Sequence, residues 1–284
     1  MVDYPRPELV ATADWLATNL RRPDVRPVDV RWRPDGSGRA VYSAGHIPGA
    51  TWLDWLVELS ERDDASGILT LADPERIGAA LGRAKVDATS TVVLYDDVAS
   101  LYAGRAWWSL TAFGFDSVRI LDGGLRAWTE AGHELENTSP GQATSAAWER
   151  LDPPARTELR LTTEDVRGLI GSPGLLLIDA RASAEYHGFE GNTQRLGHIP
   201  GAINLPVASL TQPGTGRLEP ADRLRELLLR ANVVRGRRIV CYDGSGIAAA
   251  KLAWILTLSG YDEVAVYDGG WAEWGDRLDL PVGR

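Results

Sequence analysis

The hexapeptide Gly-His-Ile-Pro-Gly-Ala occupies Gly45–Ala50 and returns unchanged at Gly197–Ala202. An identity of six residues is not expected by chance in a chain of 284 residues, and the sequence around it repeats as well. Self-similarity over a long interval indicates that one structural unit is used more than once. The chain is therefore predicted to be a duplication, in which each half can be compared with the other.

Further landmarks keep the same order in both halves. Each half has an apolar run ending in Asp-x-Arg, then the hexapeptide, an apolar run ending in Tyr-Asp, a helical stretch with a tryptophan, and an Asp-Gly-Gly segment. The landmarks are Asp29–Arg31, Tyr95–Asp96, Trp107 and Asp122–Trp128 in the first half, and Asp179–Arg181, Tyr242–Asp243, Trp254 and Asp268–Trp274 in the second. The spacing drifts by only a few residues, which favours one domain used twice over a solenoid of short units.

Short apolar runs alternate with helical patterns along the chain. The runs are apolar on consecutive positions and bounded by Gly, Asp or Pro, as in strands buried on both faces: Thr91–Tyr95, Leu175–Ile178, Arg238–Tyr242 and Val264–Tyr267. The helical patterns cover Leu9–Leu20, Asp73–Leu81, Glu219–Leu229 and Ala248–Leu258. This alternation predicts an α/β fold, with mostly parallel sheets covered by helices on both faces.

The stretch between the halves is rich in Pro, Gly, Ser and Thr and has little periodicity. We therefore predict an N-terminal domain over residues 1–138, a linker over 139–160 and a C-terminal domain over 161–284. Trp148 suggests that the linker packs against a domain.

Composition excludes several classes of function. The net charge of −9 argues against general affinity for nucleic acid or anionic membranes. No apolar run reaches the length of a membrane span, the N-terminus lacks the apolar core of a signal peptide, and a cytoplasmic location is expected. A single cysteine excludes an internal disulfide and a multi-cysteine metal site. The histidines show no metal-ligand spacing, and those of the hexapeptides, His46 and His198, are predicted to be structural.

Taken together, Asp-x-Arg, the hexapeptide and Asp-Gly-Gly followed by tryptophan resemble the tandem rhodanese family, the thiosulfate and 3-mercaptopyruvate sulfurtransferases. The resemblance covers nearly the whole chain. It implies two rhodanese-like domains with five-stranded sheets, a non-catalytic N-terminal copy and an active-site-type loop in the C-terminal copy. It also implies transfer of a sulfane sulfur from a small anionic donor to a thiophilic acceptor, for which a protein is one candidate. The transfer would pass through a cysteine persulfide without metal or organic cofactor.

The chemistry of such a loop depends on where its backbone N–H groups converge. A cysteine between a strand and a helix N-terminus is held there as thiolate, and the same amides stabilise the persulfide and the donor. The family's mercaptopyruvate-type loop, Cys-Gly-Ser-Gly-Val-Thr-Ala, aligns without a gap on Asp243–Ala249, so Gly244, Ser245, Gly246 and Ile247 match. The cysteine position is then Asp243, and the internal repeat independently pairs Asp243 with Asp96.

Two interpretations of the single cysteine, Cys241, compete. It pairs with Leu94 in the repeat, so it is expected to be a small apolar residue of a buried strand. Alternatively, a longer loop over Cys241–Ile247 would make it a displaced nucleophile, as in phosphatase relatives whose loop ends in Arg. Cys241 and Asp243 are two strand residues apart, which corresponds to about 6.5 Å. Burial in the strand would raise the pKa of the Cys241 thiol. We favour the core role and keep Cys241 as a fallback nucleophile.

Asp243 also has two interpretations. A carboxylate within converging N–H donors is expected to be strongly ionised, to stabilise the loop and to repel thiosulfate. Nucleophilic chemistry at Asp243 would need a metal or a paired base, and neither is evident nearby in the sequence.

Residues outside the loop complete the candidate substrate-binding set, which is Gly244, Ser245, Gly246, Ile247, Ala248, Glu185 and Arg195. The resemblance expects Arg where Glu185 stands. Arg181 is expected to form an internal ion pair, and Trp271 and Trp274 to be core residues. Trp271 is also a candidate for the pocket wall. The sequence thus predicts a sulfurtransferase-family protein with weak or no persulfide chemistry, or a non-catalytic binding or scaffold module, as a monomer or weak dimer.

Overall fold

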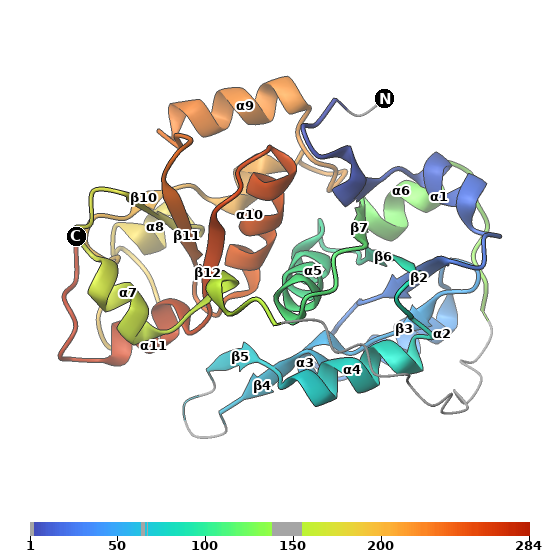
Figure 1. Ribbon diagram of the computed structural model, residues 1–284, viewed down its shortest axis with the longest axis horizontal. Helices are drawn as coiled ribbons and strands as arrows, with labels where there is room; N and C mark the ends of the chain where they lie inside the picture. Colours follow the sequence, from blue (N-terminus) through green and yellow to red (C-terminus); the bar gives the residue numbers. More distant parts are fainter. Residues whose placement is uncertain (1–2, 64–65, 67, 138–154) are drawn as a thin grey trace.

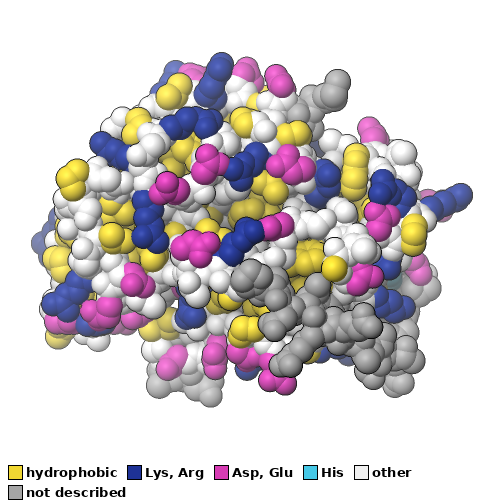
Figure 2. Space-filling model, in the orientation of Figure 1, with side chains coloured by type: hydrophobic (Ala, Val, Ile, Leu, Met, Phe, Trp, Pro, Cys, Tyr) yellow, Lys and Arg dark blue, Asp and Glu magenta, His cyan; other side chains and the backbone are white. Residues whose placement is uncertain are grey.

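A computed structural model of the chain describes residues 3–63, 66, 68–137 and 155–284 (Figure 1). The predicted linker residues 139–154, with Trp148, lie outside this described part. Within it, no helix has both the length and the apolar character needed to cross a bilayer. On the face shown in Figure 2, basic and acidic side chains are interspersed, so no broad basic patch forms there.

The predicted pair of five-stranded parallel sheets is confirmed. The first sheet has the order β1(Val10–Ala11)-β7(Val118–Leu121)-β6(Thr91–Tyr95)-β2(Val25–Asp29)-β3(Thr51–Trp52). The second has the order β10(Ile203–Asn204)-β9(Leu175–Asp179)-β11(Arg238–Tyr242)-β12(Val264–Tyr267)-β8(Arg160–Leu161). Every neighbouring pair in both sheets is parallel. The apolar runs recognised in the sequence are the central strands, because only central strands of such sheets are buried on both faces.

Helices cover both faces of each sheet. The first half contributes α1(Ala13–Asn19), α2(Gly38–Ala44), α3(Trp55–Glu58), α4(Pro74–Arg83), α5(Leu101–Phe113) and α6(Gly124–Glu130). The second contributes α7(Thr163–Leu169), α8(Ser183–Tyr186), α9(Ala221–Arg230), α10(Ile247–Leu258) and α11(Gly270–Asp276). Short 3₁₀ helices are η1(Pro7–Leu9), η2(Thr157–Leu159) and η3(Val207–Leu210), and an antiparallel hairpin joins β4(Ser60–Arg62) to β5(Leu69–Leu71). Asp73 caps α4, with its side chain accepting the N–H of Arg76.

Helices α5 and α10 lie side by side between the two sheets (Figure 1). They approach so closely that a Cβ atom added to Gly104 would stand 2.6 Å from the Cα of Lys251. One hydrophobic cluster therefore runs through both halves, from Leu94 of β6 to Cys241 of β11. The two domains share a continuous core instead of meeting across a polar surface.

The helical tryptophans show where the two halves differ by one residue. The indole N–H of Trp254 donates to the carbonyl of Leu9 at 3.1 Å, and that of Trp108 donates to the carbonyl of Leu159 at 3.2 Å. Leu9 and Leu159 end the matching helices η1 and η2, so Trp108, not Trp107, is the repeat partner of Trp254. The pairing with Trp107 fails because five residues, 96–100, separate β6 from α5, whereas four, 243–246, separate β11 from α10.

Candidate functional site

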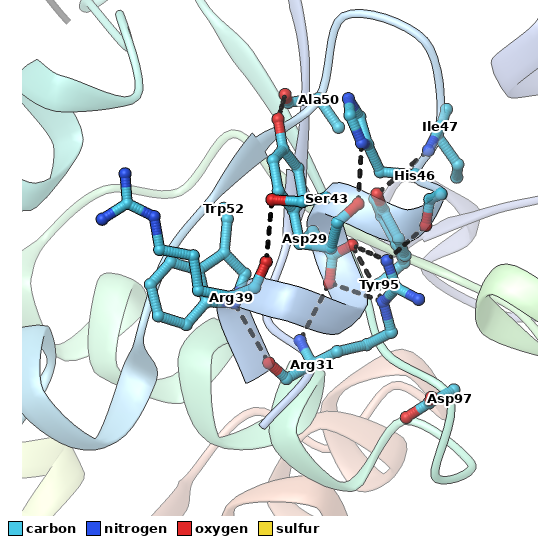
Figure 3. Close-up of polar contacts among 12 residues, drawn as sticks. Asp29, Arg31, Arg39, Ser43, His46, Ile47, Ala50, Trp52, Tyr95 and Asp97 are labelled. Atoms are coloured by element: carbon cyan, nitrogen blue, oxygen red, sulfur yellow. Dashed lines mark hydrogen bonds and ion pairs between the residues drawn. The ribbon is translucent and has the colours of Figure 1, made fainter. Parts of the chain in front are cut away.

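The hexapeptides serve structural roles that are the same in both halves. The guanidinium of Arg31 bonds Asp29 at 2.6 Å and the carbonyl of Gly45 at 2.7 Å (Figure 3). In the second half Arg181 repeats both contacts with Asp179 and Gly197 at the same distances. The predicted internal ion pair of Arg181 is therefore confirmed, and it ties each Asp-x-Arg segment to the start of its hexapeptide.

Each hexapeptide histidine is held by a neighbouring tyrosine. The Nδ1 atom of His46 lies 2.9 Å from the carbonyl oxygen of Tyr42, and the two rings stack with centroids 3.9 Å apart. His198 stacks in the same way on Tyr186, 3.0 Å from its carbonyl oxygen. Both imidazoles thus fix a turn against a helix. Among the described residues, no group of three or more His, Cys, Asp or Glu could hold a metal ion.

The loop that follows β11 brings Asp243 to the N-terminus of α10. Gly246 caps this helix with φ of 78°, and a Cβ atom there would meet the carbonyl oxygen of Asp268 at 2.9 Å. The glycine is therefore needed both for its left-handed backbone and for the close approach of the next loop. The carbonyl of Asp243 accepts the N–H of Trp271 at 2.7 Å, which fixes the loop from the α11 side.

The carboxyl group of Asp243 is only partly held by the loop. The N–H of Ala248 donates to Oδ2 at 3.1 Å, and the Oδ1 atom has no hydrogen-bond partner among the described residues. Burial raises the pKa of Asp243, although the nearby amides of Ala248, Gly246, Ala249 and Ser245 oppose the rise. The pKa of Asp243 is therefore raised instead of lowered, contrary to the expectation, because removal from water outweighs the help of the amides.

Cys241 lies in the middle of the second sheet. It belongs to β11, opposite Ile178 of β9 and Val266 of β12, and its side chain has no exposed surface. Burial raises the pKa of its thiol, and the charge of Asp243 adds to the rise. The thiolate, which is the nucleophilic form, is thereby disfavoured.

A cavity of about 460 Å³ opens in front of Asp243. Two groups of residues line it: Asp243, Ser245, Ile247 and Ala248 from the second half, and Trp32, Trp55, Leu56, Arg62, Leu69, Leu101 and Tyr102 from the first. Gly244 and Gly246 shape the loop without lining the cavity. The wall from the first half was missed in the sequence, where its one signal was Trp32, directly after the first Asp-x-Arg.

Two predicted substrate-binding residues lie elsewhere. Arg195 donates to the carbonyls of Trp274, Gly275, Arg277 and Leu280, at 2.8 Å to Trp274 and 2.6 Å to Leu280, so it fastens the C-terminal segment. Burial lowers the pKa of Arg181, and Asp179 raises it, with a smaller contribution to the rise from Glu185 on α8. Neither residue lines the cavity. Trp271 is buried beneath the guanidinium of Arg181, with 4.7 Å between the cation and the ring centre, and does not line the cavity either.

The matching loop of the first half holds its aspartate completely. The Oδ1 atom of Asp96 accepts the N–H groups of Val98 and Ser100, and Oδ2 accepts those of Tyr102 and Ala103, at 2.8–2.9 Å. Burial raises the pKa of Asp96 as well, and its amides oppose the rise. The two aspartates therefore share burial, but only Asp96 has every oxygen bonded.

Each loop is also approached by a cation from the other half. Arg105 of α5 donates to the carbonyl of Gly246 at 3.2 Å and to Asp268 at 2.7 Å. At the same place on α10, Lys251 lies near enough to Asp96 and Asp122 for both to raise its pKa, while burial lowers that pKa to about 8. The two loops are thus coupled through the interface between the domains.

Comparison with known proteins agrees with this architecture. The model of the rhodanese-like domain matches residues 12–131 and again 162–277. A Mycobacterium tuberculosis protein named "Putative thiosulfate sulfurtransferase SseB" is 37% identical over 286 residues, covering 98% of each chain. The 3-mercaptopyruvate sulfurtransferase of Escherichia coli is 32% identical, covering 95% of this chain and 96% of its own.

A solved structure shares the fold. The anaerobic ergothioneine biosynthesis enzyme of Chlorobium limicola superposes with a TM-score of 0.84 at 23% identity, over 98% of this chain and 71% of its own. With the domain matched in both halves and the relatives matched along their length, the chain belongs to the tandem rhodanese family of thiosulfate and 3-mercaptopyruvate sulfurtransferases.

Proposed function

We propose that this chain is a sulfurtransferase-family protein with weak or no persulfide chemistry, and that its C-terminal loop is a binding site. One observation carries the proposal. A carboxyl group, that of Asp243, begins the loop and lines the cavity, whereas the only thiol in the chain is buried in a central strand. Persulfide formation needs an accessible thiolate, and Cys241 offers neither access nor a favourable pKa.

The proposal is tested by thiocyanate formation from cyanide with thiosulfate or 3-mercaptopyruvate as donor. We expect the wild-type protein to form thiocyanate at a rate near the background, and the Cys241→Ala variant to show the same rate. Asp243→Cys should gain activity, because a thiol then stands among the loop amides at the helix N-terminus. Alanine is the better replacement for Cys241, because serine would bury an unpaired hydroxyl in the strand.

The names of the relatives favour a second candidate, an active sulfurtransferase that uses Cys241. It requires the strand end to open so that a small anionic donor reaches the thiol. Intact-mass measurement after donor treatment separates the two candidates. One added sulfur atom on wild-type protein, absent from Cys241→Ala, together with loss of turnover in that variant, supports the second candidate and overturns the first.

A further inference from the structure

The unpartnered oxygen of Asp243 is the starting observation. It belongs to a side chain that is 6% exposed, and it borders the cavity. A buried acceptor without a donor is unfavourable, and most such groups in proteins find a partner. In the first half, Asp96 finds four backbone donors. Asp243 has one, so a cationic group of a ligand could lie against the oxygen that the loop leaves unpartnered.

The space in front of the two aspartates also differs. Beside the Asp96 loop, the backbone of Gly216 packs so closely that an added Cβ atom would stand 3.2 Å from the Cα of Ala99. Beside the Asp243 loop the corresponding space is the cavity of about 460 Å³, within the range of small-molecule sites. The second half therefore combines an unsatisfied carboxyl group with room for a ligand.

Three aromatic residues form the facing wall of the cavity. Trp55 stacks on Tyr102 with centroids 5.2 Å apart, and Trp32 meets both rings edge-on at 6.0 and 5.8 Å. Because these rings pack on one another, the wall is built before any ligand arrives. Aromatic rings beside a carboxylate are the combination that binds ammonium groups, through attraction of the cation to the ring and to the negative charge.

One positive side chain lines the same cavity. Arg62 of β4 is exposed and forms no ion pair or side-chain hydrogen bond with another described residue. The other cation near the loop, Arg105, is paired with Asp268 and lies outside the lining. A ligand with only a positive charge would make no ion pair with Arg62. A ligand with only a negative charge would be repelled by the carboxylate of Asp243.

We propose that this cavity binds a small organic zwitterion, with an ammonium or other cationic nitrogen at Asp243 and the aromatic wall, and an acidic group at Arg62. The proposal rests on the proposed function, since it takes Asp243 as a binding group in a site without a thiol. It replaces the anionic sulfur donor expected from the family with a ligand of mixed charge.

The test compares three probes by isothermal titration on the full chain: glycine betaine as zwitterion, choline as cation and thiosulfate as anion. We expect glycine betaine to bind at least tenfold more tightly than either of the others. Asp243→Asn should weaken glycine betaine and choline at least tenfold, and Arg62→Met should weaken glycine betaine but leave choline unchanged. Arg39→Met, an exposed residue of α2 outside the cavity, is the matched control and should change nothing.

Three results would overturn the proposal: thiosulfate binding most tightly, choline binding as well as glycine betaine, or no loss in Asp243→Asn. Absence of measurable betaine binding to folded wild-type protein, checked by circular dichroism, would overturn it as well. The thiocyanate assay on the same preparation keeps this outcome separate from the proposed function. Wild-type protein that forms no thiocyanate and binds no zwitterion refutes only the proposed ligand class. A persulfide found on Cys241 refutes the proposed function on which the ligand proposal rests.

Discussion

The loop after β6 and the loop after β11 both begin with aspartate, yet they leave it in different surroundings. Asp96 is enclosed by four backbone N–H groups, and the neighbouring space is filled by the turn at Gly216. Asp243 keeps one such bond and faces a cavity. One extra loop residue before α5 gives the first loop more donors to direct inward. Duplication has thus produced one closed copy and one open copy of the same loop.

The comparison extends to the segments that cover each loop. The N–H of Leu71, at the end of the β4–β5 hairpin, donates to Asp268 at 2.6 Å, and the N–H of Leu218 donates to Asp122 at 2.7 Å. The hairpin of the first half spans 60–71, whereas the matching turn spans only 211–218. The longer segment forms part of the cavity wall through Arg62 and Leu69, and the shorter one packs directly against its loop.

The largest effect is expected from Gly104→Ala, which attacks the contact that holds both loops together. The new methyl group would stand 2.6 Å from the Cα of Lys251, and backbone there cannot yield without separating α5 from α10. We expect a loss of about 3 kcal/mol or more in the free energy of unfolding, measured with urea. Gly168→Ala is the control, because that helical glycine has open space around it and should gain about 0.5–1 kcal/mol. Equal effects would mean that the helices are not in close contact.

A pH-dependent effect is expected from Lys251, the cation that approaches the closed loop. Its pKa is about 8 in the folded chain against an ordinary value of 10.5, so between these pH values the folded state holds fewer protons than the unfolded state. Stability from this group therefore rises with pH across that window, by up to about 3 kcal/mol. Lys251→Met should remove the rise, as measured by urea unfolding at pH 7.5 and 10.5.

Arg105→Met is the matched control for this window, because the guanidinium stays charged throughout it. That variant should lower stability through loss of the contact with Asp268 without changing the dependence on pH between 8 and 10.5. A rise in Lys251→Met as large as in wild-type protein would show that the amine is not held by burial.

A smaller effect separates the two aspartates themselves. Asp96→Asn places an NH₂ group where two backbone N–H groups donate, and we expect a loss of about 2 kcal/mol at pH 7. Asp243→Asn can place its NH₂ at the position of the unpartnered oxygen, and it removes a buried charge, so its stability should stay within about 1 kcal/mol of wild type. Equal losses in the two variants would mean that both loops bind their aspartate equally well.

Much of this arrangement could be predicted from repetition. The alternation of apolar runs and helical patterns predicted the sheets, the ion pair of Arg181 was expected, and the alignment of the halves paired Asp243 with Asp96. The pairing of Trp107 failed where one inserted residue shifts a helix. The wall formed by Trp32 and Tyr102 could not be foreseen, because it depends on how the domains dock. The direction of the pKa shift of Asp243 was misjudged because the sequence reveals nearby amides but not the depth of burial.

Arg105 of α5 lies beside the loop of the second half, and Lys251 of α10 lies beside the loop of the first half. Each domain therefore supplies a positive charge to acids of the other. A fragment ending before the linker would keep Asp96 and Asp122 but lose the amine of Lys251, and the remaining fragment would keep Asp268 without Arg105. Either excised half would expose the apolar flank of its central helix and lose the cation that the other half supplies, although Asp268 would keep Arg160 and Asp96 would keep its four backbone donors. Each domain therefore depends on the other both for its apolar flank and for one of the charges beside its loop.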